Sequence, residues 1–81
     1  MSRIEKLKDR LRSRPRDFTW AELVRVLGAL GYNEVEGSGS RKCFDGAGLP
    51  RIRLHAPHPG NELKAYQVKD VVELLTEHGL L

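Results

Sequence analysis

The stretch Arg51-Ile52-Arg53-Leu54-His55, written RIRLH, alternates charged or polar residues with aliphatic ones without a break. A period of two is typical of a β-strand that has one face in the core and the other in solvent. Ile52 and Leu54 are therefore expected to face the core. Arg51, Arg53 and His55 then share the exposed face, so this strand predicts a sheet that is covered on one side only.

Two segments before this strand also read as short strands, Tyr32–Glu36 and Arg41–Phe44. The turn residues Asp45-Gly46-Ala47-Gly48 separate the second segment from the third. Adjacent strands joined by short turns pair antiparallel. The sequence thus predicts a three-stranded antiparallel meander. If Phe44 faces the core of this sheet, strand parity turns Lys42 inward as well, unless a bulge or an edge position intervenes.

Three helices are expected around the meander, over about 3–13, 20–30 and 66–77, where apolar residues recur at helical spacing. Thr19-Trp20-Ala21-Glu22 matches the capping box that starts a helix, and Gly31 is well placed to end it. Pro15 ends the first helix and favours an extended Arg14. The prediction is an α+β fold of order α-α-β-β-β-α, with the helices packed on one face of the sheet, as in a double-stranded-RNA-binding domain.

The chain has 81 residues, which suits a single domain over 1–81, with 1–16 as a basic N-terminal helical extension and 17–81 as the core. No apolar run approaches the roughly 20 residues of a membrane span, and the start lacks the apolar centre of a signal peptide. The single cysteine, Cys43, excludes an internal disulfide and is expected to be a buried strand thiol. We expect a cytoplasmic protein without membrane contact, metal or cofactor.

Charge is distributed unevenly along the chain. Residues 1–16 carry seven cations and two anions, and residues 41–64 carry five cations and two anions. Acidic segments lie between and after these two zones. Such asymmetry is typical of proteins that bind a polyanion such as RNA or DNA, although a basic helix is often merely solvated.

Several residues around the predicted sheet are suited to phosphate chemistry. Arginines spaced along one rigid face can each neutralise a phosphate and release a counterion. The glycines of Gly37-Ser38-Gly39-Ser40 let backbone N–H groups approach an anion, although the same composition also suits a plain hairpin loop. His55 and His58 are the imidazoles available for proton transfer, and a metal site built on both lacks a third ligand at a familiar spacing.

Two motifs together resemble one protein family. Gly39-Ser40-Arg41-Lys42-Cys43-Phe44, followed by His58-Pro59-Gly60-Asn61-Glu62-Leu63-Lys64 and a helix ending in His78-Gly79-Leu80, is similar to HicA, the small toxin of bacterial toxin–antitoxin pairs. The resemblance covers about residues 20–81. It implies a fold like a double-stranded-RNA-binding domain, cleavage of mRNA independently of the ribosome, and neutralisation by a HicB antitoxin. The residues expected to contact RNA are Gly39, Ser40, Arg41, Lys42, Arg51, Arg53 and Lys64.

The chain departs from the family pattern at the position that matters most for catalysis. In typical members the residue after Gly-Ser is the catalytic histidine, and here it is Arg41. A guanidinium stabilises the charge of a transition state but is a poor base, so His58 and His55 are expected to transfer protons. Three readings remain: a nuclease toxin, a non-catalytic RNA-binding module on the same fold, and a basic interaction protein that docks an acidic partner. The sequence does not define the RNA target or the oligomeric state.

Overall fold

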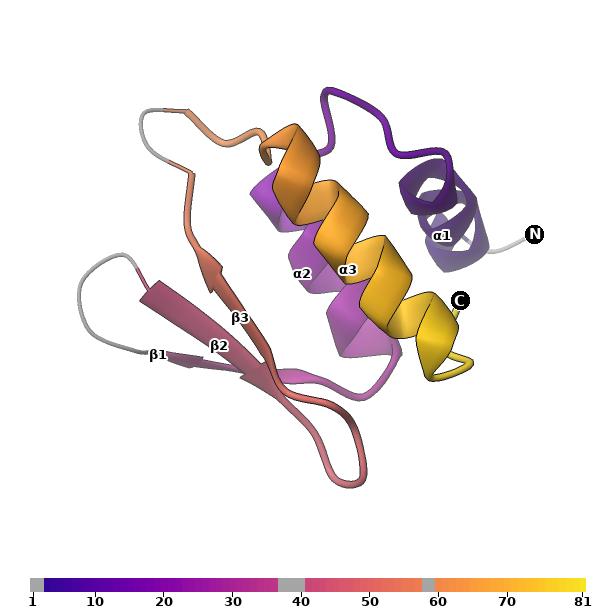
Figure 1. The fold of residues 1–81 in the computed structure, drawn as a ribbon, viewed down its shortest axis with the longest axis vertical. Helices are drawn as coiled ribbons and strands as arrows, with labels where there is room; N and C mark the ends of the chain where they lie inside the picture. The colour runs from indigo at the N-terminus through magenta and orange to yellow at the C-terminus, as the bar shows by residue number, and fades with distance from the viewer. Residues whose placement is uncertain (1–2, 37–40, 58–59) are drawn as a thin grey trace.

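The computed structural model describes residues 3–36, 41–57 and 60–81. The elements follow in the order α1 (Arg3–Arg12), α2 (Trp20–Ala29), β1 (Asn33–Glu36), β2 (Arg41–Asp45), β3 (Ile52–His55) and α3 (Ala65–Glu77) (Figure 1). The predicted α+β fold and its order α-α-β-β-β-α are confirmed, with element boundaries close to those expected.

The sheet has β2 at its centre, antiparallel to β1 on one side and to β3 on the other. Phe44 of β2 lies opposite Glu34 of β1 and Ile52 of β3. Phe44 and Ile52 are buried. Figure 1 shows α2 and α3 together on one side of the sheet, with α1 beyond them. The sheet therefore has one face toward the helices and one toward solvent, as its alternation predicts.

Helix α2 begins at the predicted residue and ends one residue before the predicted end, because both of its ends are capped. The Glu22 backbone N–H donates to Thr19 Oγ1 at 3.2 Å, and the Thr19 N–H donates to Glu22 Oε1 at 3.0 Å. At the other end Gly31 has φ +104°, and the Tyr32 N–H donates to the Leu27 carbonyl at 2.9 Å. This is the Schellman arrangement, which favours glycine because it requires a positive φ.

One apolar core joins all three helices to the covered face of the sheet. The largest fully buried side chains are Phe18, Phe44, Leu11, Leu23, Leu27, Leu75, Val26, Val68 and Val71. The rings of Trp20 and Phe44 contact each other with centroids 5.6 Å apart, which fixes the start of α2 against β2. Within the described ranges, no helix is long and apolar enough to cross a membrane.

Helix α1 is attached to this core by the apolar residues Leu7 and Leu11 and by one charged residue. Leu11 is fully buried, and the Arg10 guanidinium lies 5.7 Å from the centroid of the Phe18 ring. Arg10 also donates to Glu22 Oε2 at 3.1 Å and to Asp17 Oδ1 at 3.0 Å. The hydrogen bond from Arg10 lowers the pKa of Glu22, and the bonds to Glu22 and Asp17 raise the pKa of Arg10.

The turn after α1 differs from the prediction. Arg14 has φ +53°, so the expectation that Pro15 holds it extended was wrong. The end of the helix explains the difference, because the Arg14 N–H donates to the Leu11 carbonyl at 2.9 Å and the Ser13 hydroxyl donates to the Arg10 carbonyl at 2.6 Å. These two bonds satisfy carbonyls that the end of α1 would otherwise leave free.

Candidate nucleic-acid interface

The register of β2 against β3 decides which polar side chains share the solvent face of the sheet. Arg41 lies directly opposite His55, and Cys43 lies opposite Arg53. Directly opposed residues have Cβ atoms about 4.5–5.5 Å apart, and diagonal neighbours such as Arg41 and Arg53 are separated by roughly 7–8 Å. Arg41, Arg53 and His55 are all exposed. We refer to these three residues as the open-face cluster.

A shallow hollow accompanies the open-face cluster. Its volume is about 280 Å³, and it is lined by Arg41, Arg53, Leu54 and His55. Two arginines and one histidine therefore line a single space at the end of the sheet. Guanidiniums bind the oxygens of a phosphate through several N–H groups, and an imidazole accepts or donates a proton near neutral pH. Anion binding beside a proton-transfer group is the chemistry that this hollow allows.

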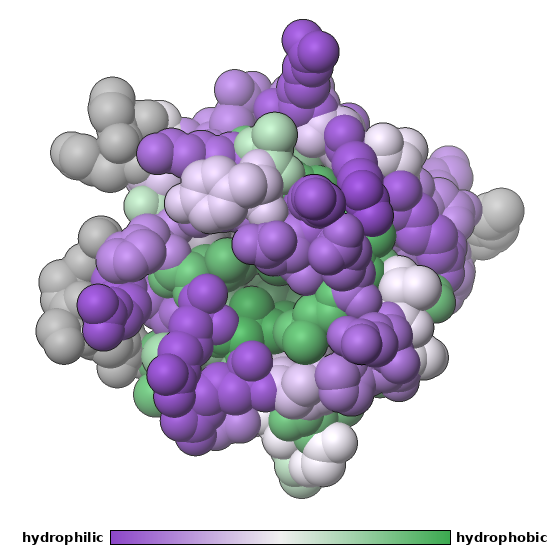
Figure 2. All heavy atoms as spheres, viewed as in Figure 1, coloured by the Kyte–Doolittle hydropathy of each residue, from purple (hydrophilic) through white to green (hydrophobic). Residues whose placement is uncertain are grey.

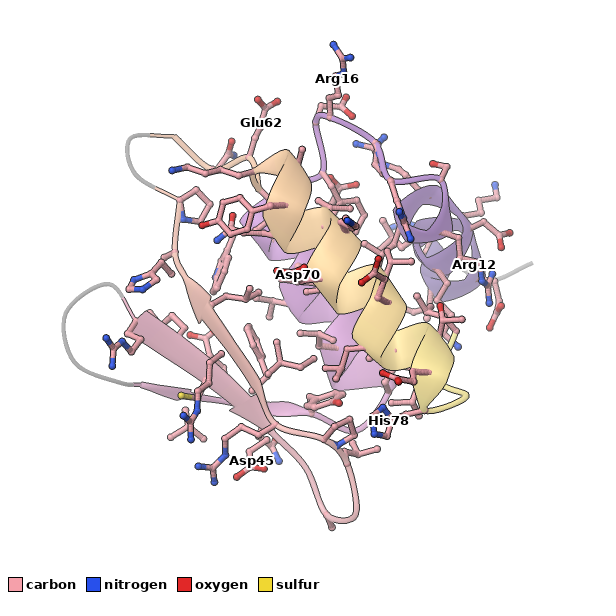
Figure 3. All side chains as sticks on the ribbon, viewed as in Figure 1. Arg12, Arg16, Asp45, Glu62, Asp70 and His78 are labelled. Carbon is pink, nitrogen blue, oxygen red and sulfur yellow. The ribbon has the colours of Figure 1, made fainter. Side chains whose placement is uncertain are left out.

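Arg51 lies just before β3 rather than inside it and is engaged by an acid. Its Nη2 atom is 2.9 Å from Asp45 Oδ2, and both side chains are close to half exposed. Figure 3 places Asp45 at the end of the sheet that lies far from Glu62. Because Asp45 already balances its charge, Arg51 offers less to an incoming phosphate than Arg41 or Arg53.

Strand parity places Lys42 on the other side of β2 from the open-face cluster and Cys43 on the same side as it. Lys42 lies opposite Leu54, on the side that carries Phe44, so it is half-buried on the helix-covered side of the sheet. Cys43 lies opposite Arg53 and Val35 and is only half-buried. The expectation of a buried thiol was therefore wrong. Phe44 occupies the core position of β2, and its neighbour must face the other way.

The segment between β3 and α3 is tied to the start of α2 by backbone bonds. The Trp20 N–H donates to the Asn61 carbonyl at 2.7 Å, and the Leu63 N–H donates to the Phe18 carbonyl at 2.8 Å. Lys64, which was predicted to contact RNA, follows at the N-cap of α3 and is exposed. The predicted residues Gly39, Ser40 and His58 lie outside the described part of the chain.

Gln67 is a residue that the sequence reasoning missed, and it connects the open-face cluster to α3. Its Nε2 donates to the His55 carbonyl at 2.9 Å, and its Oε1 accepts from the Lys64 backbone N–H at 2.9 Å. The side chain is 3% exposed. A buried glutamine so bonded holds the end of β3 against the start of α3. In the sequence, the one indication of this role is that Gln67 follows Lys64 by three residues, the spacing at which the Glu or Gln of a capping box follows the N-cap residue.

Tyr66 is a second residue that the sequence reasoning missed. It stands next to Gln67 in the first turn of α3 and is 58% exposed, which is unusual for a large aromatic side chain. An exposed ring next to Gln67, whose side chain bonds to the end of β3, offers a flat surface on which a nucleic-acid base can stack.

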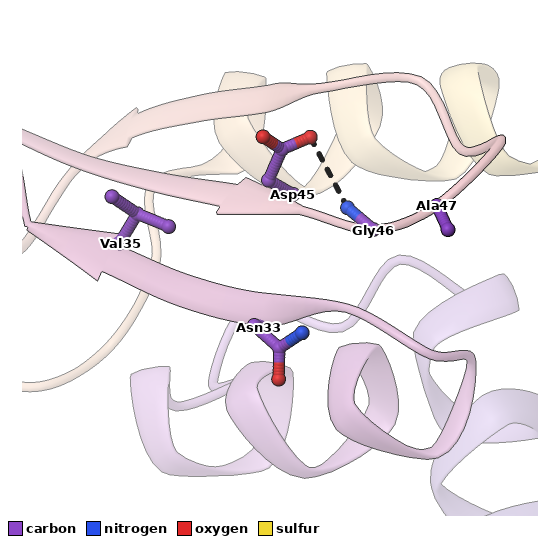
Figure 4. Close-up of a pocket in the computed structure, with 5 residues that line it drawn as sticks. All are labelled: Asn33, Val35, Asp45, Gly46 and Ala47. Atoms are coloured by element: carbon purple, nitrogen blue, oxygen red, sulfur yellow. Dashed lines mark hydrogen bonds between the residues drawn. The ribbon is translucent and has the colours of Figure 1, made fainter.

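A hollow larger than that of the open-face cluster has different chemistry. It measures about 400 Å³ and is lined by Asn33, Val35, Asp45, Gly46 and Ala47 (Figure 4). Of the described residues that line it, the charged one is Asp45, which accepts from the Gly46 N–H at 3.1 Å and is paired with Arg51. A cavity whose charge is negative does not suit a phosphate. Within the described ranges, no group of three or more His, Cys, Asp or Glu side chains could hold a metal ion.

The fold and the open-face cluster define a small α+β domain that presents cations on an uncovered sheet face. A comparison with protein families matches residues 20–80 to the family described as the HicA toxin of bacterial toxin–antitoxin. The chain therefore belongs to the HicA toxin family, as its motifs predicted. The match begins at the first residue of α2, so α1 lies outside it. No curated protein and no solved structure matches the chain in two further comparisons.

Proposed function

We propose that this HicA family member binds and cleaves mRNA in the cytoplasm and is neutralised by a HicB-like antitoxin. The observation that carries the proposal is the open-face cluster, in which Arg41 and Arg53 flank the imidazole of His55 around one hollow. Cations of this density on an otherwise mixed surface favour a polyanionic ligand.

The two arginines and the histidine of the cluster have different roles in the proposed reaction. Cleavage of RNA without a metal requires a base to remove the proton from the 2′-hydroxyl, which then attacks the neighbouring phosphorus. Negative charge develops on the phosphorane oxygens, and Arg41 and Arg53 would stabilise it. His55 would accept the proton, because a guanidinium stays protonated throughout the accessible pH range. His58 would then protonate the leaving 5′-oxygen.

The remaining predicted residues would bind RNA on either side of the reacting phosphate. Backbone N–H groups of Gly39 and Ser40 would approach one phosphate, and Lys64 would contact another from the start of α3. Arg51 and Lys42 would contribute less, because Arg51 is paired with Asp45 and Lys42 lies on the helix side of β2. Tyr66, exposed beside Gln67, would stack on a base.

The test is cleavage of a purified transcript by the wild type and by His55→Ala, His58→Ala and Arg41→Ala. We expect the rate to fall by about 10²–10⁴ in a histidine variant that loses acid–base catalysis, and the wild type to show a bell-shaped pH–rate profile. Arg16→Ala, an exposed arginine in the α1–α2 connection, is the matched control (Figure 3). Wild-type rates in both histidine variants would show that this mechanism is wrong.

Arg41 itself favours a second candidate function, a non-catalytic RNA-binding module. A guanidinium at the position where family members carry their catalytic histidine retains anion binding and loses the base. In that case the chain binds RNA with a steep salt dependence and leaves transcripts intact. Arg41→His separates the two functions, because it would create cleavage in a binding module and only change the rate of an active nuclease.

A further inference from the structure

An apolar groove runs between β3 and α3. Its volume is about 200 Å³, and its apolar lining comes from Ile52 and Leu54 of β3 and from Val71 and Leu74 of α3. Figure 2 shows a hollow with an apolar floor and a hydrophilic rim at the centre of the view, where Figure 1 draws β3 and α3. Leu54 and Leu74 are only half-buried, so the floor of the groove is accessible.

The backbone of β3 along this groove is open to a further strand. Among the strands that the structure describes, β3 is an edge of the sheet, because β2 is its one neighbour there. Within the described ranges, no hydrogen bond joins Ile52, Arg53 or Leu54 to any group outside the sheet. The His55 carbonyl points toward Gln67 of α3, and alternate residues of an antiparallel strand direct their N–H and C=O groups to the same side. The N–H and C=O of Arg53 therefore face the groove side as well.

The side chains of β3 specify the chemistry of a strand that would pair there. One face of an added strand would lie over the apolar floor, beside Leu54, and the other would continue the open face, beside Arg53. The first face requires apolar side chains and the second requires acidic ones. From this alternation we propose that the β3–α3 groove binds an extended acidic–apolar segment of a protein partner, which adds as a fourth strand to the sheet.

Two other occupants fit the groove less well. A second copy of the chain, paired β3 to β3, would place the Arg51, Arg53 and His55 series against the same cations, and directly opposed like charges destabilise a sheet. RNA would meet an apolar floor and the carboxylate of Asp70, which also lines the groove. A fourth strand also covers an exposed edge, which proteins otherwise protect from uncontrolled pairing.

The inference rests on the proposed function only in identifying the partner as the antitoxin. It is tested with a capped synthetic peptide that alternates glutamate with valine, added to ¹⁵N-labelled protein. We expect amide shift changes and slowed hydrogen exchange along Ile52–His55. Two further peptides carry N-methyl groups on the glutamate amides or on the valine amides. Only one set of amides faces β3, so one methylated peptide should bind and the other should not.

Leu74→Glu places a carboxylate in the groove and should weaken the peptide's Kd by about tenfold or more, which corresponds to 1.4 kcal/mol. Val35→Glu is the matched control, because Val35 is a half-exposed aliphatic residue on the other edge strand, β1, and its replacement should leave the Kd unchanged. Three results would overturn the proposal. The two methylated peptides would bind equally, the amide shifts would be confined to β1 or α1, or only an oligoribonucleotide would cause shifts in the groove. If the wild type binds the peptide but leaves transcripts intact, that result would instead contradict the nuclease function alone.

Discussion

Replacing Gln67 with methionine should strongly destabilise the domain, although it changes the side-chain volume little. The glutamine is 3% exposed, and it makes one hydrogen bond to the His55 carbonyl and one to the Lys64 N–H, both 2.9 Å long. Methionine satisfies neither group, both lost bonds are partly buried, and a buried polar group left without a partner costs about 1–3 kcal/mol. We expect a loss of roughly 2–4 kcal/mol, from a total that is on the order of 4–12 kcal/mol for a domain of this size.

Thermal and urea unfolding measure this loss directly. The melting temperature should fall by roughly 10 °C or more, since 1 kcal/mol corresponds to about 4–8 °C in a domain of 60–100 residues. Lys69→Met is the control, because Lys69 is an exposed position on the same helix. An unchanged melting temperature in Gln67→Met would show that the bridge between β3 and α3 contributes nothing.

Gln67→Glu separates the two bonds of the bridge. The introduced carboxylate can still accept from the Lys64 N–H. Its other oxygen replaces the NH₂ donor of glutamine and places an acceptor against the His55 carbonyl, which is itself an acceptor. Protonation restores a donor, so the pKa of this group is raised in the folded state. Its stabilising contribution is then present below the ordinary glutamate pKa of about 4.3 and is lost as the pH rises through the folded-state value. A variant whose stability does not recover in acid would contradict this geometry.

Three further outcomes are expected. Arg41→Ala and Arg53→Ala should each reduce the slope of log K against log salt by about 0.7 for single-stranded RNA, measured by fluorescence anisotropy, and unchanged slopes would remove the open-face cluster from the interface. Tyr66→Ala should weaken RNA binding by about 1–3 kcal/mol with the slope unchanged, and Tyr66→Phe should bind like the wild type. The hydrogen bond from Arg10 lowers the pKa of Glu22. The stabilising contribution of Glu22 is therefore present above the ordinary glutamate pKa and is lost as the pH falls through the lowered value. In urea unfolding, Glu22→Gln should flatten the fall of stability at acid pH.

The features that sequence alone predicted are those determined by neighbours along the chain. The capping box at Thr19 and Glu22 and the glycine at position 31 bounded α2, because caps act within a few residues of the helix end. The alternation of Arg51–His55 identified a half-covered sheet, since the side-chain period of a strand is independent of the rest of the fold. Parity within β2 puts Lys42 on the side of Phe44, a point on which the sequence had left a bulge or an edge position open.

The features that were missed depend on contacts between distant segments. No local pattern indicates that Arg10 bonds to Glu22, or that Asp45 engages Arg51 across the turn between β2 and β3. Gln67 reads as an ordinary polar helix residue until the end of β3 lies beside it. The exposure of Cys43 follows from parity once Phe44 is assigned to the core, but the preference of cysteine for buried sites favoured the opposite interpretation.

The two proposals for β3 together imply how neutralisation would work. Arg53 would contact RNA through its guanidinium, and the backbone of the same residue would pair with an added acidic strand. The carboxylates of that strand would lie beside Arg53 and His55, in the space that a phosphate needs. RNA and the partner would therefore compete for one strand, and inhibition would not require the partner to reach Arg41 on β2. Binding of the acidic peptide should then raise the apparent Kd for RNA in proportion to its concentration, whereas an allosteric inhibitor would reach a plateau.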